Sequence, residues 1–192
     1  MLDIDTHEEV SVNEVGVGYL YSPALMSGYY GDEEATNHNL VKDENGVVWY
    51  NTEDLIRVNE NGELFLEGRI RRIALTIDSK GNPTKIIPER TKKCISMIKE
   101  INNCEVITVP NERVVNTAIA FVTLNQGQLP TEDLRKKIML HCQTNIPEYM
   151  VPSEIIYLDE IPVNSNKKPD LIGLEKIYFE GISSLPIKKK KK

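Results

Sequence analysis

The stretch WYNTEDLIRVNENGELFLEGRIR, residues 49–71, marks the point where the chain changes from one kind of sequence to another. Two apolar runs with strand-like alternation, 47–50 and 64–66, flank the pair Asn61-Gly62. That pair supplies the positive φ angles that a tight hairpin turn requires. The sequence therefore predicts two antiparallel strands joined by a short turn.

The ends of this predicted hairpin carry polar residues that suit a small-molecule site. We expect Thr52 and Asp54 at the end of the first strand and Arg69 at the end of the second. A carboxylate accepts hydrogen bonds from a vicinal diol, and an arginine donates hydrogen bonds through its planar guanidinium. The alternative is a surface hairpin whose charges are only solvated.

Composition indicates a chain that can bury a hydrophobic core. It has 192 residues, of which 40% are hydrophobic, enough for one or two domains. The net charge is −6, or about −11 once Lys188–Lys192 are subtracted, which argues against a nucleic-acid-binding protein. Since no apolar run approaches the roughly 20 residues of a membrane span and no signal sequence follows Met1, we expect a cytoplasmic protein without stable membrane association.

The three cysteines, Cys94, Cys104 and Cys142, are scattered through apolar patterns. Their spacing contains neither a CxxC pair nor a zinc-binding pattern. We therefore expect free, buried thiols in a reducing compartment and no metal site.

Residues 1–67 read as a small β-rich unit with one helical turn. The run 16–21 is rich in strand-forming residues and ends before Pro23. Asp32 opens an acidic segment that predicts a short helix, because carboxylates favour the positive end of the helix dipole. By itself this unit is short for a domain, so we expect it to be a piece of something larger.

After Arg71 helices alternate with strands. The expected elements are a helix from Pro88 to about residue 100, an antiparallel pair at 104–109 and 117–124, a helix from about Pro130 that stops before Pro147, and a strand at 155–158. This order predicts a compact α+β domain over residues 68–178 with both helices on one face of the sheet. Residues 179–192 read as a basic tail, in which like charges repel.

Five segments, in order, resemble the C-terminal third of the adenylate-forming enzymes. This superfamily comprises acyl-CoA synthetases, peptide-synthetase adenylation domains and D-alanyl carrier-protein ligases. The segments are SGYYGDEEAT at 27–36, YNTEDL at 50–55 against the family's Y-R-T-G-D-L, Gly68-Arg69, PEYMVP at 147–152, and NSNKKPD at 164–170 against T-x-N-G-K-x-D. The resemblance runs from about residue 16 to about residue 174.

The resemblance implies roles for individual residues. It assigns the carboxylate that binds the ATP ribose to Asp54, with Thr52 beside it in the nucleotide site, and a nucleotide-contacting guanidinium to Arg69. It assigns the catalytic lysine to Lys168. The hinge, about which the small domain rotates between two half-reactions, falls on Arg71.

The implied reaction joins a carboxylate to the α-phosphate of ATP, expels pyrophosphate and then passes the acyl group to a thiol. The implied cofactors are ATP and Mg²⁺, and the implied partners are the carboxylate substrate and CoA or a phosphopantetheine carrier protein. The family's phosphate-binding loop is not matched, so we expect a C-terminal fragment or truncated protein that is inactive by itself. The alternative is a degenerate, non-catalytic module that binds a partner.

Several departures from the family motifs lie close to the implied site. Glu53 and Lys167 stand where the motifs have glycine, and Arg71 stands where the hinge is usually Asp or Lys. Leu171 replaces a common arginine. The segment 74–83 looks longer than the family loop that lines the thiol tunnel, which bears on the second half-reaction more than on the first.

Overall fold

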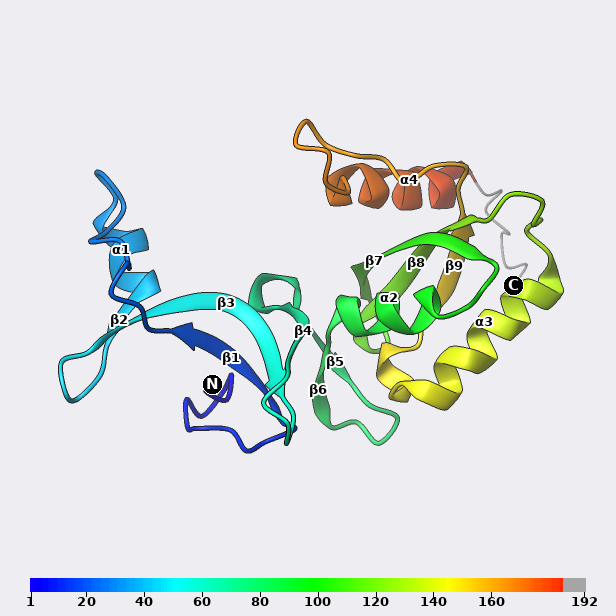
Figure 1. Ribbon diagram of the computed structural model, residues 1–192. Coiled ribbons are helices and arrows are strands. Elements are labelled where there is room, and N and C mark those ends of the chain that lie inside the picture. The colour runs from blue at the N-terminus through cyan, green and yellow to red at the C-terminus, as the bar shows by residue number, and fades with distance from the viewer. Residues whose placement is uncertain (185–192) are drawn as a thin grey trace. The chain divides into compact units, whose positions relative to one another are not determined.

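The computed structural model describes residues 1–184, which divide into two compact units at Ile73 and Ala74 (Figure 1). The lysines at 188–192 lie outside the described residues. Residues 179–184, expected to begin a basic tail, instead continue a helix. None of the helices within 1–184 combines the length and the apolar character that crossing a membrane requires.

An antiparallel sheet of four strands forms the first unit. Its strands are β1 (Val15–Leu20), β2 (Leu40–Lys42), β3 (Val48–Val58) and β4 (Leu64–Arg69). The long β3 pairs with each of the other three strands. β1 lies on one edge of β3, and β2 and β4 pair with the two ends of the other edge, while residues 52–53 have no register partner.

The predicted hairpin joins β3 to β4. Gly62 has a φ of +78° and its N–H donates to the carbonyl of Asn59 at 2.9 Å. The side chain of Asn59 accepts from two backbone N–H groups of the turn, those of Asn61 and Glu63. The turn is confirmed, but the expectation that Thr52 and Asp54 end the first strand is wrong, because β3 continues to Val58.

A short helix, α1 (Glu33–Asn39), begins where the acidic residues predict it. The side chain of Asp32 accepts from the N–H of Ala35 at 2.9 Å, which satisfies one free donor of the first turn. The hydroxyl of Thr36 accepts from the N–H of Tyr29 at 2.8 Å, so the helix also fixes the segment before it.

The second unit contains a sheet of three strands, β7 (Ile101–Asn111), β8 (Val115–Leu124) and β9 (Glu154–Tyr157). The antiparallel pairing of β7 with β8 confirms the prediction from the two β-branched runs. β9 pairs with β8 in the parallel direction, since the chain returns through the helix α3 (Glu132–Asn145) before it adds the last strand.

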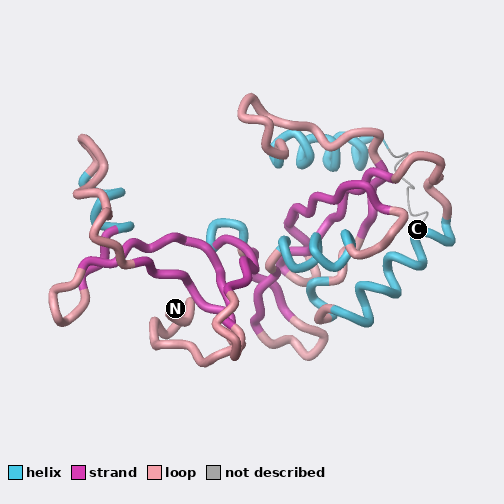
Figure 2. The backbone as a smooth tube through the Cα atoms, in the orientation of Figure 1, coloured by secondary structure: helices cyan, strands magenta, loops and turns pink. Residues whose placement is uncertain are grey.

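Helices cover both faces of this sheet (Figures 1 and 2). α2 (Pro88–Ser96) and α3 pack on one face, as predicted, around a core that includes Ile95, Ile138 and Ala120. A further helix, α4 (Leu171–Ser184), lies on the opposite face, where Leu174 packs with Phe121. α2 is shorter than predicted, because the chain turns after Ser96 and enters β7 at Ile101.

The segment expected as a long divergent loop is a two-stranded hairpin, β5 (Ala74–Ile77) and β6 (Pro83–Ile86). The side chain of Asp78 closes its turn by accepting from two backbone N–H groups. The hydroxyl of Thr76 donates to the carbonyl of Val114 at 2.6 Å. The hairpin is thereby attached to the start of β8 within the second unit.

The three cysteines are free and buried, as predicted. Burial raises the pKa of both Cys104 and Cys142 to about 12. These thiols are therefore protonated at neutral pH and serve as small apolar side chains in the core.

Candidate functional site

The motif at residues 50–55 forms an irregularity in β3. Residues 52–54 lie opposite the single residue Gly18, because the register with β1 shifts there. At the centre of this bulge, Glu53 adopts a left-handed backbone with a φ of +56°. A Cβ at Gly18 would lie 2.9 Å from the Thr52 hydroxyl, so only glycine fits against the bulge. Bulges of this kind change the direction in which side chains project from a strand.

Thr52 holds the bulge in place. Its hydroxyl donates to the carbonyl of Gly18 at 2.8 Å and accepts from the N–H of Asp54 at 3.2 Å. The hydroxyl proton is therefore used within the protein. Thr52 is beside Asp54, as the resemblance implies, but its contacts in the structure are those of a residue that supports the site.

Asp54 and Arg69 meet across the β3–β4 pair. They are register partners, and Arg69 Nε lies 2.8 Å from Asp54 Oδ1. The Arg69 side chain is 65% exposed and the Asp54 side chain is 27% exposed. Oδ1 is buried, and no hydrogen-bond donor within residues 1–184 is correctly directed at it, so the contact with Arg69 is an ion pair.

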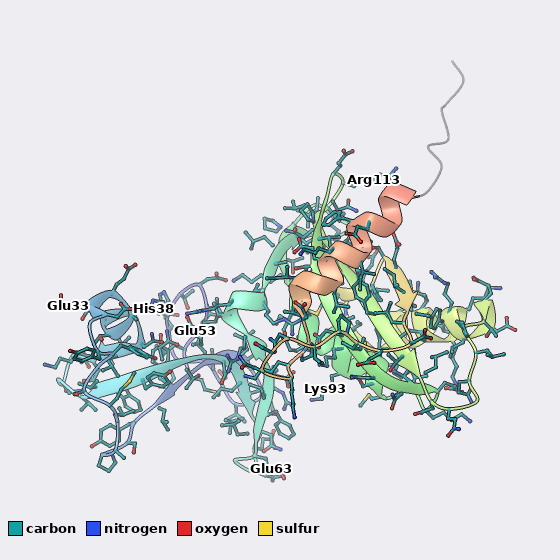
Figure 3. The ribbon with its side chains drawn as sticks, turned by 90° about the horizontal axis from the view of Figure 1, so that it is seen from above. Glu33, His38, Glu53, Glu63, Lys93 and Arg113 are labelled. Carbon is teal, nitrogen blue, oxygen red and sulfur yellow. The ribbon has the colours of Figure 1, made fainter. Side chains whose placement is uncertain are left out.

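Glu53 joins three elements of the first unit. Its two carboxylate oxygens contact different partners: Oε1 lies 3.0 Å from His38 Nε2, and Oε2 lies 2.8 Å from Arg71 Nε. His38 extends from α1 toward Glu53 (Figure 3). The Glu53 side chain is only 18% exposed, whereas His38 and Arg71 are 57% and 74% exposed.

The environment of Glu53 favours its charged form. Partial burial acts to raise its pKa, but the hydrogen bonds and charges of His38 and Arg71 outweigh burial, so the pKa of Glu53 lies below its usual value. The carboxylate is thus ionised at neutral pH. Nearby, the phenol of Tyr29 lies 3.5 Å from that of Tyr50, and this hydrogen bond raises the pKa of Tyr29.

Arg71, which the resemblance implies as the hinge, lies in the short 3-10 helix η1 (Ile70–Arg72). The turn is closed by the N–H of Ile73, which donates to the carbonyl of Ile70 at 3.0 Å. Ile73 is the last residue of the first unit. The side chain of the implied hinge is therefore held by β3 just before the chain leaves that unit.

Lys168 lies in a loop of the second unit that is ordered by Asn164. The backbone of Asn164 donates to the carbonyl of Lys168 at 2.8 Å, and its side chain accepts from the N–H of Lys168 at 3.1 Å. Lys167 has a φ of +58°, which allows the tight reversal. The Lys168 side chain is exposed, and no acceptor for its ammonium occurs among the described residues.

Asp170, the last residue of this motif, has a structural role. Its side chain accepts from the N–H of Gly173 at 3.0 Å and so caps the start of α4. Its own N–H donates to the carbonyl of Pro162 at 2.8 Å. A Cβ at Gly173 would lie 2.7 Å from the Asp170 carboxylate, so glycine is needed for this cap.

The PEYMVP segment also supports the fold. Its centre forms a 3-10 turn, η2 (Glu148–Met150), and Met150 is buried. The carbonyl of Met150 accepts from the hydroxyl of Thr91 at 2.8 Å, which attaches the segment to α2.

The structure thus brings Asp54, Arg69 and Thr52 together in the first unit and presents Lys168 on the second. Sequence reasoning did not find His38, since a single histidine on a short helix carries no signal. Across residues 1–184, no group of three or more His, Cys, Asp or Glu side chains has an arrangement suited to a metal ion.

Comparison with known proteins shows which family part of the chain resembles. Residues 93–168 match the family described as the AMP-binding enzyme C-terminal domain, and the match ends at Lys168. The resemblance to the C-terminal part of the adenylate-forming enzymes is confirmed.

Individual relatives show how much of such an enzyme the chain represents. The putative acyl-CoA ligase YdaB of Bacillus subtilis is 28% identical over 83% of this chain and 29% of its own length. A linear gramicidin synthase polypeptide of Brevibacillus parabrevis is 28% identical over 87% of this chain and 2% of its own length. The chain therefore spans about a third or less of the length of the relatives it matches.

A solved adenylate-forming structure has the same fold. ATP-bound MatB from Rhodopseudomonas palustris matches with a TM-score of 0.74 over 92% of this chain and 33% of its own, at 20% identity. The α+β fold predicted for the chain, a β-rich piece followed by a compact α+β domain, is thereby confirmed.

Proposed function

We propose that this chain is the C-terminal region of an AMP-forming ligase, which activates a carboxylate as an acyl- or aminoacyl-adenylate and transfers it to a thiol. Lys168 is its catalytic residue. The observation that carries the proposal is the exposed Lys168 ammonium, which has no acceptor among the described residues although its backbone is fixed by Asn164. A lysine held on an ordered loop, with its ammonium free, suits a residue that contacts the substrate only when the lid domain closes.

The residues of the first unit fit a nucleotide. The Asp54 side chain is partly exposed and would accept hydrogen bonds from a ribose diol, and the exposed side chain of Arg69 lies beside it. Thr52 maintains the bulge that orients Asp54. ATP would supply the activated phosphoryl group, and Mg²⁺ would enter with its phosphates, because this metal commonly binds through them and only one or two carboxylates.

The chemistry explains why a lysine is needed. Charge spreads over the α-phosphoryl group as the carboxylate attacks, and catalysis consists largely of stabilising that charge. Lysine carries a compact cation on a flexible stem, which can reach both the carboxylate and the phosphate. The lid domain, predicted as residues 68–178, would bring Lys168 to the nucleotide and withdraw it afterwards by rotation about Arg71.

The acceptor thiol belongs to CoA or to a phosphopantetheine carrier protein. Relatives named as an acyl-CoA ligase and as a gramicidin synthase support both choices. The protein would act in the cytoplasm, where the three free cysteines remain reduced.

A second candidate function is a non-catalytic binding module. The observation in its favour is that Glu53 and Lys167 replace glycine in two motifs of the implied site. Against it, both residues adopt left-handed φ angles, so the backbone conformation that glycine serves is still present.

The test uses the chain joined to the N-terminal portion of an adenylate-forming relative, since the phosphate-binding loop lies there. Lys168→Ala should lower the single-turnover rate of adenylate formation by about two to three orders of magnitude while ATP binding stays nearly unchanged. Lys167→Ala is the matched control and should keep the rate. The isolated chain should show no ATP–pyrophosphate exchange above blank.

Two outcomes would contradict the proposal. If both lysine variants keep full activity, this loop takes no part in the reaction. If the Lys167 variant is inactive and the Lys168 variant is active, the catalytic lysine is Lys167. If the joined protein binds ATP but forms no adenylate with any carboxylate offered, the non-catalytic alternative is favoured.

A further inference from the structure

Two departures from the family motifs, Glu53 and Arg71, contact each other. The contact joins Oε2 and Nε at 2.8 Å, and the Glu53 side chain is largely buried. One partner lies next to Asp54 in the bulge of β3, and the other lies at the exit from the first unit. The ion pair therefore links the proposed nucleotide site to the proposed hinge.

The backbone of Glu53 shows that the side chain at this position matters. A φ of +56° is unfavourable for any residue with a Cβ, whereas glycine adopts it freely. Glycine at position 53 would be sufficient for the backbone conformation of the bulge. Glutamate at this position is explained by what its carboxylate does, which is to bind Arg71 and His38.

The charged groups around Glu53 favour this pair. His38 holds the second carboxylate oxygen and so keeps the side chain oriented toward Arg71. The phenols of Tyr29 and Tyr50, which lie 3.5 Å apart, are nearby. Arg71 thus supplies its guanidinium to one carboxylate oxygen of Glu53, and His38 contacts the other.

The position of Arg71 gives the pair a mechanical effect. The 3-10 turn that contains it is closed by the bond from Ile73 to Ile70, and Ile73 ends the first unit. With the first unit held fixed, a change of φ at Arg71 would carry its Cβ and guanidinium away from β3, whereas a change of ψ would move only the residues that follow. Rotation about φ at this residue therefore acts against the ion pair.

We propose that Glu53 is a positioning residue that holds Arg71, and with it the exit segment 70–73, on β3 and so restrains rotation of the second unit. This inference rests on the proposed function, in which that rotation separates two half-reactions. The restraint acts before any ligand binds. It can be measured on the nucleotide-free chain.

The experiment measures distances between spin labels placed on the two units. Glu44→Cys and Gln126→Cys provide exposed sites, and the native cysteines are buried. Glu53→Gln and Arg71→Met should each widen the distance distribution by at least a factor of two, and the double variant should equal either single one. Arg71→Lys retains the charge and should give an intermediate width.

Controls separate loss of the pair from general loosening. Glu100→Gln removes a comparable ion pair, with Lys137, inside the second unit and should leave the distribution unchanged. Raising the salt concentration should widen the distribution of the parent chain but not that of Arg71→Met. Circular dichroism of each variant shows whether its fold is intact.

A distribution that stays the same in Glu53→Gln and Arg71→Met, with both variants folded, would overturn the inference. So would widening by Glu100→Gln to the same extent. Because the measurement uses no nucleotide, its outcome is independent of adenylate formation. If the joined protein forms no adenylate but the variants still widen the distance distribution, the proposed function is refuted and the proposed role of Glu53 is supported.

Discussion

Glu53 and Lys167 share one backbone conformation, with φ angles of +56° and +58°. Both stand where the resembled motifs have glycine. Glu53 has two polar partners that compensate for the conformation, whereas the Lys167 side chain is exposed and its ammonium has no contact within residues 1–184. The two positions therefore respond differently to glycine.

The first prediction concerns Lys167→Gly. Removing the Cβ relieves a left-handed conformation that costs about 1 kcal/mol, and the greater freedom of the unfolded chain offsets part of this gain. We expect the free energy of unfolding in urea to rise by about 0.5 kcal/mol. Lys168→Gly is the control, since Lys168 has no positive φ, and it should lower that free energy by about 0.5–1 kcal/mol.

The second prediction compares two lysines that bind glutamates. Lys92 lies 2.7 Å from Glu105, which is 2% exposed, and Lys137 lies 2.9 Å from Glu100 near the surface. Lys92→Ala takes an ammonium from a buried carboxylate and should cost about 2–3 kcal/mol in urea unfolding. Lys137→Ala should cost less than about 1 kcal/mol. Equal costs would show that burial does not govern these pairs.

A third comparison uses two residues on the same helix. Ile138 is fully buried between α3 and the sheet, and Leu140 is 65% exposed. Ile138→Ala should lower the free energy of unfolding by about 2–5 kcal/mol, since it leaves a cavity in the core. Leu140→Ala should change it by less than about 0.5 kcal/mol. Thermal and urea unfolding followed by circular dichroism check both values.

The fourth prediction concerns thiol reactivity and its pH dependence. The thiolate is the reactive form, and burial raises the pKa of Cys104 and Cys142 to about 12, well above the usual value. Folded protein should therefore react slowly with a disulfide reagent at pH 8, and the rate should keep rising with pH beyond 9. In guanidinium all three cysteines should react quickly. Fast labelling of folded protein at pH 7 would contradict the burial of these residues.

Regular patterning made much of the second unit predictable. The β-branched runs and the spacing of Leu134, Ile138 and Cys142 give a hairpin and a helix with the expected faces. α4 was missed, because its packing depends on Leu174 meeting Phe121 on a face of the sheet that local sequence does not reveal. The parallel direction of β9 is likewise a tertiary property.

The candidate site was predictable only in part. Asp54 and Arg69 were expected to be close, because antiparallel strands bring them together, and the structure gives that contact. The bulge could not be foreseen, since glutamate disfavours the left-handed conformation it adopts at Glu53. Because the bulge was not expected, the contacts of His38 and Arg71 with one carboxylate, that of Glu53, could not be predicted either.

The parallel pairing of β9 with β8 also sets an order of folding. β7 and β8 are adjacent along the chain, so their pairing closes only a short loop. α3 lies between β8 and β9 in the chain, so pairing β9 with β8 closes a longer loop and costs more chain entropy. During synthesis the β7–β8 hairpin can therefore form early, whereas β9 and α4 complete the unit last.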